Sequence, residues 1–244
     1  MTSRTPKLGG VAEPVPLRPK RYLFLTVGWA ACLLLSAVGR DTTVVRALVP
    51  LTFTGLIVAG VIGISADRRQ LLAAAATGAV WLISLWAAYA IAHPVSTVVM
   101  ALLGVVFIFV VAFSILSEFL GAKRITADIL WGAIGVYLLI GTAFGLLFFA
   151  VEAAVPGSLT GAVDQRSFVY FSLVTMTTLG YGDIAPASEL ARLLAAFTAI
   201  CGVMYTAVIV ARLVAIEIIS ASHRGAPNTD QARRPQASDS VEID

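Results

Sequence analysis

The chain has 244 residues, of which 59% are hydrophobic and 13% are charged. Soluble domains carry about 25% charged residues, and a mean hydropathy of +0.91 leaves too little polar surface to cover a soluble globule of this size. The composition therefore predicts an integral membrane protein and disfavours soluble enzymes, nucleic-acid-binding proteins and disulfide scaffolds. The two cysteines and two histidines lie apart from one another, so neither a cofactor nor a metal site is predicted.

Six apolar runs are long enough to cross a hydrocarbon core of about 30 Å. In chain order they are 22–38, 44–65, 71–92, 95–119, 129–151 and 190–219. A further apolar stretch, 167–179, lies between the last two runs and is too short to span, which is typical of a re-entrant segment. We therefore predict an all-α membrane protein with six transmembrane helices and a re-entrant segment between helices five and six.

Basic residues predict the orientation in the membrane. With a cytoplasmic N-terminus, 12 of the 17 Lys and Arg residues fall on the inner side and Arg212 falls within the last run. The outer side then holds Arg40, Arg46, Arg166 and Arg192. Since basic residues favour the cytoplasmic side, we expect a multi-pass protein of the cell membrane with both termini cytoplasmic and the re-entrant segment open to the outside.

The most informative segment reads SFVYFSLVTMTTLGYGDIAP, from Ser167 to Pro186. Its first half can form a short helix, and its glycines at 180 and 182 allow backbone angles that other residues avoid. Such a strand can turn successive carbonyl oxygens to one side, where they substitute for the water around a dehydrated cation. One strand cannot encircle an ion, so this interpretation implies a homotetramer with four strands around one axis.

At these residues the chain resembles the potassium-channel signature Thr-x-Gly-Tyr-Gly-Asp. The resemblance implies a selectivity filter whose carbonyls, with one threonine hydroxyl, coordinate potassium. Matched by position, its residues are Thr178, Leu179, Gly180, Tyr181 and Gly182, the first four of which would bind the ion. Asp183 would lie at the outer mouth, and Leu179 takes the place of a commoner valine.

The resemblance extends to the pore-loop, voltage-gated-like cation channel superfamily in its six-helix form, and the pore domain is similar to the two-helix bacterial ion channel family. It implies an outer helix at 129–151, a pore helix at 166–177 and an inner helix at 188–220. Gly202 matches a frequent hinge glycine, and the positions matching the cavity lining are Val203, Thr206 and Val210. The chain then divides into a cytoplasmic tail (1–21), a four-helix domain (22–120), a cytoplasmic linker (121–128), the pore domain (129–220) and a disordered cytoplasmic tail (221–244).

Some positions depart from the family pattern. The fourth run lacks the recurring basic residues of a voltage sensor, so voltage gating of the usual kind is not expected. Tyr170 and Phe171 stand where many relatives carry tryptophans, and Val174 stands where some carry a glutamate. Tyr170 could donate a hydrogen bond behind the filter or could simply pack. For Arg212, a role near the cytoplasmic gate and snorkelling to the headgroups are the two alternatives.

These observations favour a homotetrameric potassium channel in the lipid bilayer that conducts passively, with no enzymatic activity and no ligand beyond the permeant ion. A channel of relaxed selectivity and a non-conducting subunit are close alternatives. A membrane enzyme or a proton-coupled transporter would require acids or histidines at mid-membrane depth. The apolar runs lack them, since Glu118 lies at an inner end and Glu152 and Asp164 lie at the outer edge.

Overall fold

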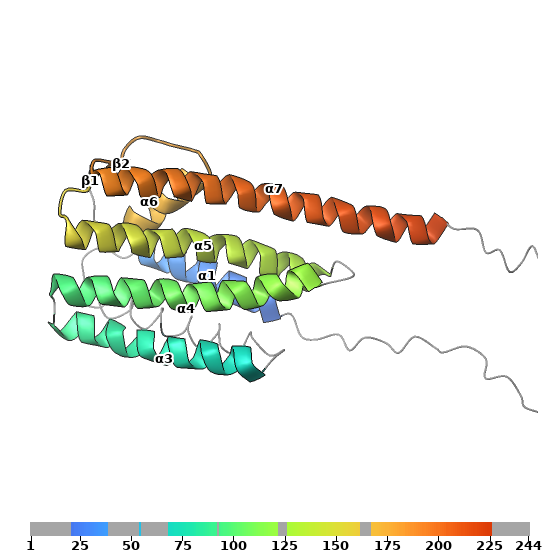
Figure 1. Cartoon of the computed structure of the whole chain (residues 1–244), viewed down its shortest axis with the longest axis horizontal. Coiled ribbons are helices and arrows are strands. Elements are labelled where there is room, and N and C mark those ends of the chain that lie inside the picture. Colours follow the sequence, from blue (N-terminus) through green and yellow to red (C-terminus); the bar gives the residue numbers. More distant parts are fainter. Residues whose placement is uncertain are drawn as a thin grey trace, which may run out of the picture.

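The computed structural model describes residues 21–38, 54, 68–91, 93–121, 126–161 and 167–225. Its helices are α1 (Arg21–Val38), α3 (Arg68–Ile91), α4 (Pro94–Gly121), α5 (Ala127–Ala154), α6 (Ser167–Met176) and α7 (Glu189–Gly225). Two short strands, β1 (Leu159–Thr160) and β2 (Ala185–Pro186), complete the described part. The long helices lie side by side, with α6 between α5 and α7 at one end of the bundle (Figure 1).

Within the described residues, four helical segments are long and apolar enough to cross a membrane. They are Arg68–Ala88, Pro94–Gly121, Ala127–Ala154 and Glu189–Ile216. Helix α1 has a shorter apolar stretch, and the predicted run 44–65 lies outside the described residues apart from Thr54. The class of a helical, multi-pass membrane protein is confirmed, whereas the count of six helices stays a prediction.

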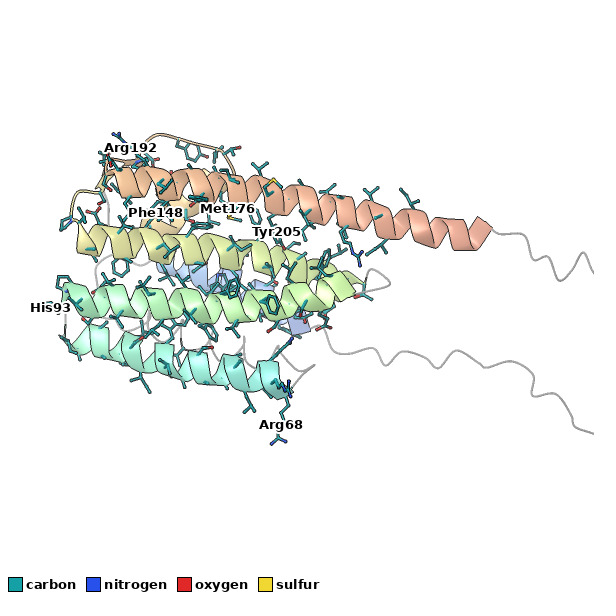
Figure 2. All side chains as sticks on the ribbon, in the orientation of Figure 1. Arg68, His93, Phe148, Met176, Arg192 and Tyr205 are labelled. Carbon is teal, nitrogen blue, oxygen red and sulfur yellow. The ribbon has the colours of Figure 1, made fainter. Side chains whose placement is uncertain are left out.

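The order of the ends agrees with an up-and-down bundle. His93 and Arg192 lie at one end of the helix bundle, and Arg68 lies at the opposite end of α3 (Figure 2). Helix α7 continues to Gly225 and projects beyond the other helices (Figure 1). It therefore extends past the predicted boundary at 220, while the predicted tail at 1–21 lies outside the described residues except for Arg21.

Helices α4 and α5 form an antiparallel hairpin, because α4 ends at Gly121 and α5 begins at Ala127. Thr126 caps α5: its hydroxyl oxygen accepts a hydrogen bond from the Ile129 N–H at 3.3 Å. A very short connection therefore joins the predicted pore domain to α4. Helices α4 and α5 pack against each other.

Helix α1 packs against a face of α5 that carries two glycines. A Cβ atom at Gly135 would lie 2.6 Å from the Thr26 hydroxyl oxygen, and one at Gly132 would lie 3.3 Å from the ring of Tyr22. The Thr26 hydroxyl donates to the Trp131 carbonyl at 2.8 Å. Small residues thus allow the close backbone approach on which helix association in a bilayer depends.

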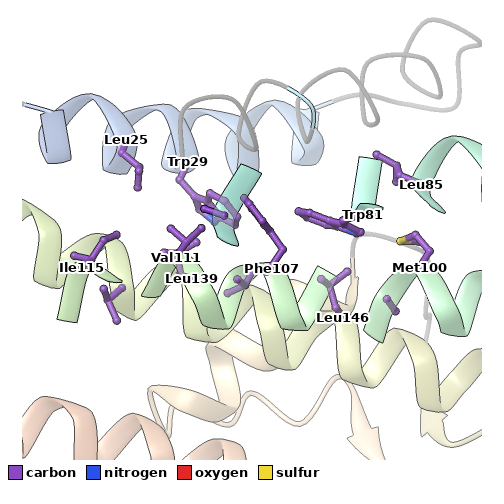
Figure 3. Packing of buried hydrophobic residues seen from close by; sticks show 14 of the residues in the cluster. Leu25, Trp29, Trp81, Leu85, Met100, Phe107, Val111, Ile115, Leu139 and Leu146 are labelled. Carbon is purple, nitrogen blue, oxygen red and sulfur yellow. The ribbon is translucent and has the colours of Figure 1, made fainter. Parts of the chain in front are cut away.

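The main buried cluster joins α1, α3, α4 and α5. Trp29, Trp81, Phe107 and Leu139 lie at its centre (Figure 3). A second, smaller cluster lies around α6 and fixes its place against α5 and α7. Its buried members are Phe148, Leu159, Phe168, Phe171, Ile184 and Ala191.

Candidate ion-binding site

The segment after α6 begins with a specific helix end. The Leu179 N–H donates to the Val174 carbonyl at 2.9 Å, and the Thr178 N–H donates to the Thr175 carbonyl at 3.0 Å. This pair of hydrogen bonds is a Schellman motif. In that motif the residue just after the C-cap adopts a left-handed conformation and is usually glycine. Here that residue is Thr178, with φ of 59°. A β-branched residue at positive φ is rare, so this position carries backbone strain.

Positive φ recurs at every second residue of the segment. Gly180 has φ of 59° and Gly182 has φ of 81°, whereas Leu179 and Tyr181 have negative values. Residues of alternating handedness turn successive carbonyls toward the same side of the strand. The backbone therefore has the alternation expected of a carbonyl-lined filter, although coordination of an ion stays a prediction.

The whole segment is exposed in the single chain. Leu179 is 55% exposed and Tyr181 is 67% exposed, although both carry large apolar side chains. Exposed apolar side chains of this size indicate a surface that contacts another molecule or another copy of the chain.

An open hollow of about 490 Å³ lies beside the start of the segment. Its lining comes from α5, from the end of α6 with the residue after it, and from α7: Tyr137, Met176, Thr177, Gly202, Val203, Thr206 and Ala207. Two of the predicted cavity residues, Val203 and Thr206, therefore line the same hollow beside the start of the segment. Val210 is 53% exposed and does not line this hollow.

At the outer end, Tyr170 contacts Asp183. The Tyr170 hydroxyl donates to an Asp183 carboxylate oxygen at 2.8 Å. This hydrogen bond raises the pKa of the Tyr170 phenol, so the group stays a neutral donor. Of the two roles considered for Tyr170, the structure shows the donor, whereas Phe171 and Val174 are buried.

If the segment is the predicted filter, Tyr170→Phe should leave assembly unchanged and make potassium current decay several-fold faster during sustained opening. The reason is that Asp183 loses the donor that holds the outer end of the segment. Single-channel recording in planar bilayers measures the decay. A decay rate equal to that of the unmodified protein would show that this hydrogen bond does not hold the filter.

Gly202, the predicted hinge, is buried where α7 meets the end of α6. A Cβ atom there would overlap the Met176 carbonyl oxygen and would lie 2.6 Å from Met176 Cγ. Met176 itself lies between α5 and α7 (Figure 2). The structure thus gives a packing reason for this glycine, and the hinge stays a prediction.

Arg212 reaches the end of α4. Its guanidinium donates to the Leu120 carbonyl at 2.7 Å, within the last turn of that helix. Carbonyl groups there lack partners within the helix and carry partial negative charge. The side chain therefore joins α7 to α4, a contact that neither sequence-based alternative for Arg212 includes.

Comparisons with known proteins agree with this geometry. Residues 133–217 match the family model described as an ion channel. Two-pore potassium channel 1 of Arabidopsis thaliana is 48% identical over 63 residues, which are 25% of this chain and 16% of that protein. Inward rectifier potassium channel Kirbac3.1 of Paramagnetospirillum magnetotacticum is 38% identical over 78 residues, 30% of this chain and 24% of that protein. No solved structure matches the chain.

A third relative is the human voltage-gated potassium channel regulatory subunit KCNF1, which is 39% identical over 74 residues, 30% of this chain and 15% of that protein. The chain therefore spans no more than about a quarter of the length of these relatives. Apolar helices long enough to span, the short helix α6 and the family match indicate an ion-channel domain in residues 133–217. More narrowly, the matched part of the chain is similar to potassium channels of the pore-loop superfamily.

Proposed function

We propose that the protein is a potassium-selective channel that conducts passively through a filter formed by residues 178–182 of four copies. The observation that carries this proposal is the alternation of backbone handedness at Thr178, Gly180 and Gly182. A strand of this kind presents a row of carbonyl oxygens to one axis. Such oxygens replace the hydration shell of potassium better than that of sodium, through cavity size or through ligand number and field strength.

Thr178 supports an ion-binding role on energetic grounds. The left-handed conformation costs about 1–2 kcal/mol for a residue other than glycine, and a glycine would end α6 without that cost. A requirement for the threonine hydroxyl as an ion ligand would explain why a threonine occupies this strained position. Strained residues of this type cluster at functional sites.

The exposed surface supports a tetramer of this chain. The apolar side chains of Leu179 and Tyr181 and the exposed residues along α7 lie next to the proposed conduction path. Four copies related by a rotation axis would cover them and would complete the ring of carbonyls. We expect the conducting form to be a homotetramer in the cell membrane with both termini cytoplasmic.

Flux measurements in liposomes test the proposal, with Gly180→Ala as the loss-of-function variant. The unmodified protein should pass potassium and exclude sodium. Alanine at 180 places a Cβ at positive φ and should abolish this preference, at about 1–2 kcal/mol of strain per subunit.

Gly28→Ala is the control, since Gly28 lies in α1, away from the segment, and an added Cβ there, as at Gly180, meets no described atom within 4 Å. It should retain the selectivity of the unmodified protein. Equal sodium and potassium flux through the unmodified protein, or a cross-linking ladder that ends at the dimer, would contradict the proposal.

A second candidate is a non-conducting regulatory subunit, which the similarity to the regulatory subunit KCNF1 favours. The two candidates differ in one result. A pure homotetramer that is stabilised by potassium but passes none would support the regulatory subunit, and flux through the homotetramer alone would exclude it.

A further inference from the structure

The chain after α5 returns to the segment that follows the proposed filter. Strands β1 and β2 pair antiparallel, with Leu159 opposite Pro186 and Thr160 opposite Ala185, and they lie together beside the start of α7 (Figure 1). The Ser158 carbonyl accepts hydrogen bonds from the N–H groups of two residues after β2, at 2.7 and 3.3 Å. We call residues 152–161 the outer clamp. It is joined to residues 183–188 by backbone contacts.

Glu152 shapes the outer clamp. One carboxylate oxygen accepts from the Gly157 N–H at 2.7 Å, and the other accepts from the Leu159 N–H at 3.0 Å. The residue lies in the last turn of α5, where the helix dipole disfavours a negative charge. Both carboxylate oxygens are used to hold the loop, which explains an acidic residue at this unfavourable place.

At Gly161 the outer clamp contacts Asp183, the residue that follows the proposed filter. Gly161 has φ of 100°, and a Cβ atom there would overlap the Asp183 carbonyl oxygen. On the inner side, Leu159 is 6% exposed and Ile184 is 9% exposed, and both belong to the cluster around α6. The path of the chain immediately after Gly182 is therefore defined by the clamp on one side and by packed apolar residues on the other.

We propose that Glu152 is a positioning residue for the filter. Through β1 and Gly161, its carboxylate holds residues 183–186 in place and so keeps the outer end of the filter in its potassium-binding conformation. Glu152 itself touches neither the filter nor the ion. This inference rests on the proposed function, because it assigns a role in maintaining that filter.

Glu152→Gln in the full-length protein is the direct test, because an amide keeps the size of the side chain but replaces one of two accepting oxygens by a donor. We expect the potassium concentration that protects the tetramer from heat dissociation to rise several-fold, and the preference for potassium over sodium in liposomes to fall. Gly161→Ala should produce the same two changes, because the added Cβ would displace Asp183 from the outer clamp. Glu189→Gln, which changes the glutamate in the first turn of α7, is the control and should behave like the unmodified protein.

A merely structural role would lower the melting temperature equally at all potassium concentrations and leave selectivity intact, and that result would overturn the inference. If the unmodified protein neither conducts nor responds to potassium, the proposed function fails instead. Hydrogen exchange of the Leu159 and Ala187 amides then still assesses the clamp: exchange must accelerate in Glu152→Gln relative to Glu189→Gln. Equal exchange in the two variants would show that the carboxylate does not hold the loop.

Discussion

In the proposed potassium channel, replacing Gly202 by alanine is expected to abolish conduction and to remove the stabilisation of the tetramer by potassium. The added Cβ would overlap the Met176 carbonyl oxygen and would lie 2.9 Å from the Met176 carbonyl carbon. These are backbone atoms at the end of α6, so the clash can be relieved only by moving the helix end from which the filter begins. Overpacking of this kind costs about 1–3 kcal/mol per site, and a tetramer would carry it in every subunit.

The result separates the packing role of Gly202 from the predicted hinge. If the glycine served only as a hinge, Gly202→Ala would alter opening, but the filter would still bind potassium and protect the tetramer from heat. Gly28→Ala is the control, since an added Cβ at that helical glycine meets no described atom within 4 Å. Thermal dissociation measured across a potassium series, together with flux in liposomes, checks both expectations. A Gly202→Ala tetramer with normal potassium protection would contradict the packing role.

The second large effect is expected at Gly145, where α5 meets α6. A Cβ atom there would lie 2.9 Å from Val169 Cα and 3.2 Å from Val169 N. Because these are backbone atoms, Gly145→Ala should push α6 away from α5 and destabilise the protein by about 1–3 kcal/mol. A third contact, with Val169 Cγ2 at 2.9 Å, belongs to the side chain. Val169→Ala removes this contact but leaves the clashing backbone atoms in place, so it should restore only a small part of the lost stability. Thermal unfolding in detergent measures both variants.

Gly141 provides the matched comparison on the same face of α5. Its added Cβ would meet the end of a side chain, Leu173 Cδ2, at 2.5 Å. The side chain can be shortened, so Leu173→Val should recover part of the stability lost in Gly141→Ala. A double-mutant cycle measures this coupling. No coupling between 141 and 173, or full recovery of Gly145→Ala by Val169→Ala, would contradict the packing described for this interface.

The local features of the candidate site can be predicted from the sequence. Hydropathy and run length indicate which segments are apolar and that 167–179 is too short to span, because both are properties of neighbouring residues. The freedom of glycine to adopt positive φ is likewise local, so Gly180 and Gly182 by themselves indicate an alternating strand. Resemblance places Thr178 in the filter, but its positive φ has no signal in the residue type, since it follows from the helix-ending hydrogen bonds of α6.

Only the tertiary structure decides the contacts between segments distant in the chain. The sequence indicates that Glu152 is an acid at the outer edge, but its hydrogen bonds depend on how the loop after α5 folds back toward β2. The resemblance matches Gly202 to a hinge glycine, whereas its packing against Met176, a residue of another helix, is visible only in the folded structure. The contact of Arg212 with the end of α4 joins residues 92 positions apart. The sequence by itself thus determines a helical membrane protein with a filter-like strand. The packing around that strand depends on contacts between residues far apart in the chain, which no local pattern encodes.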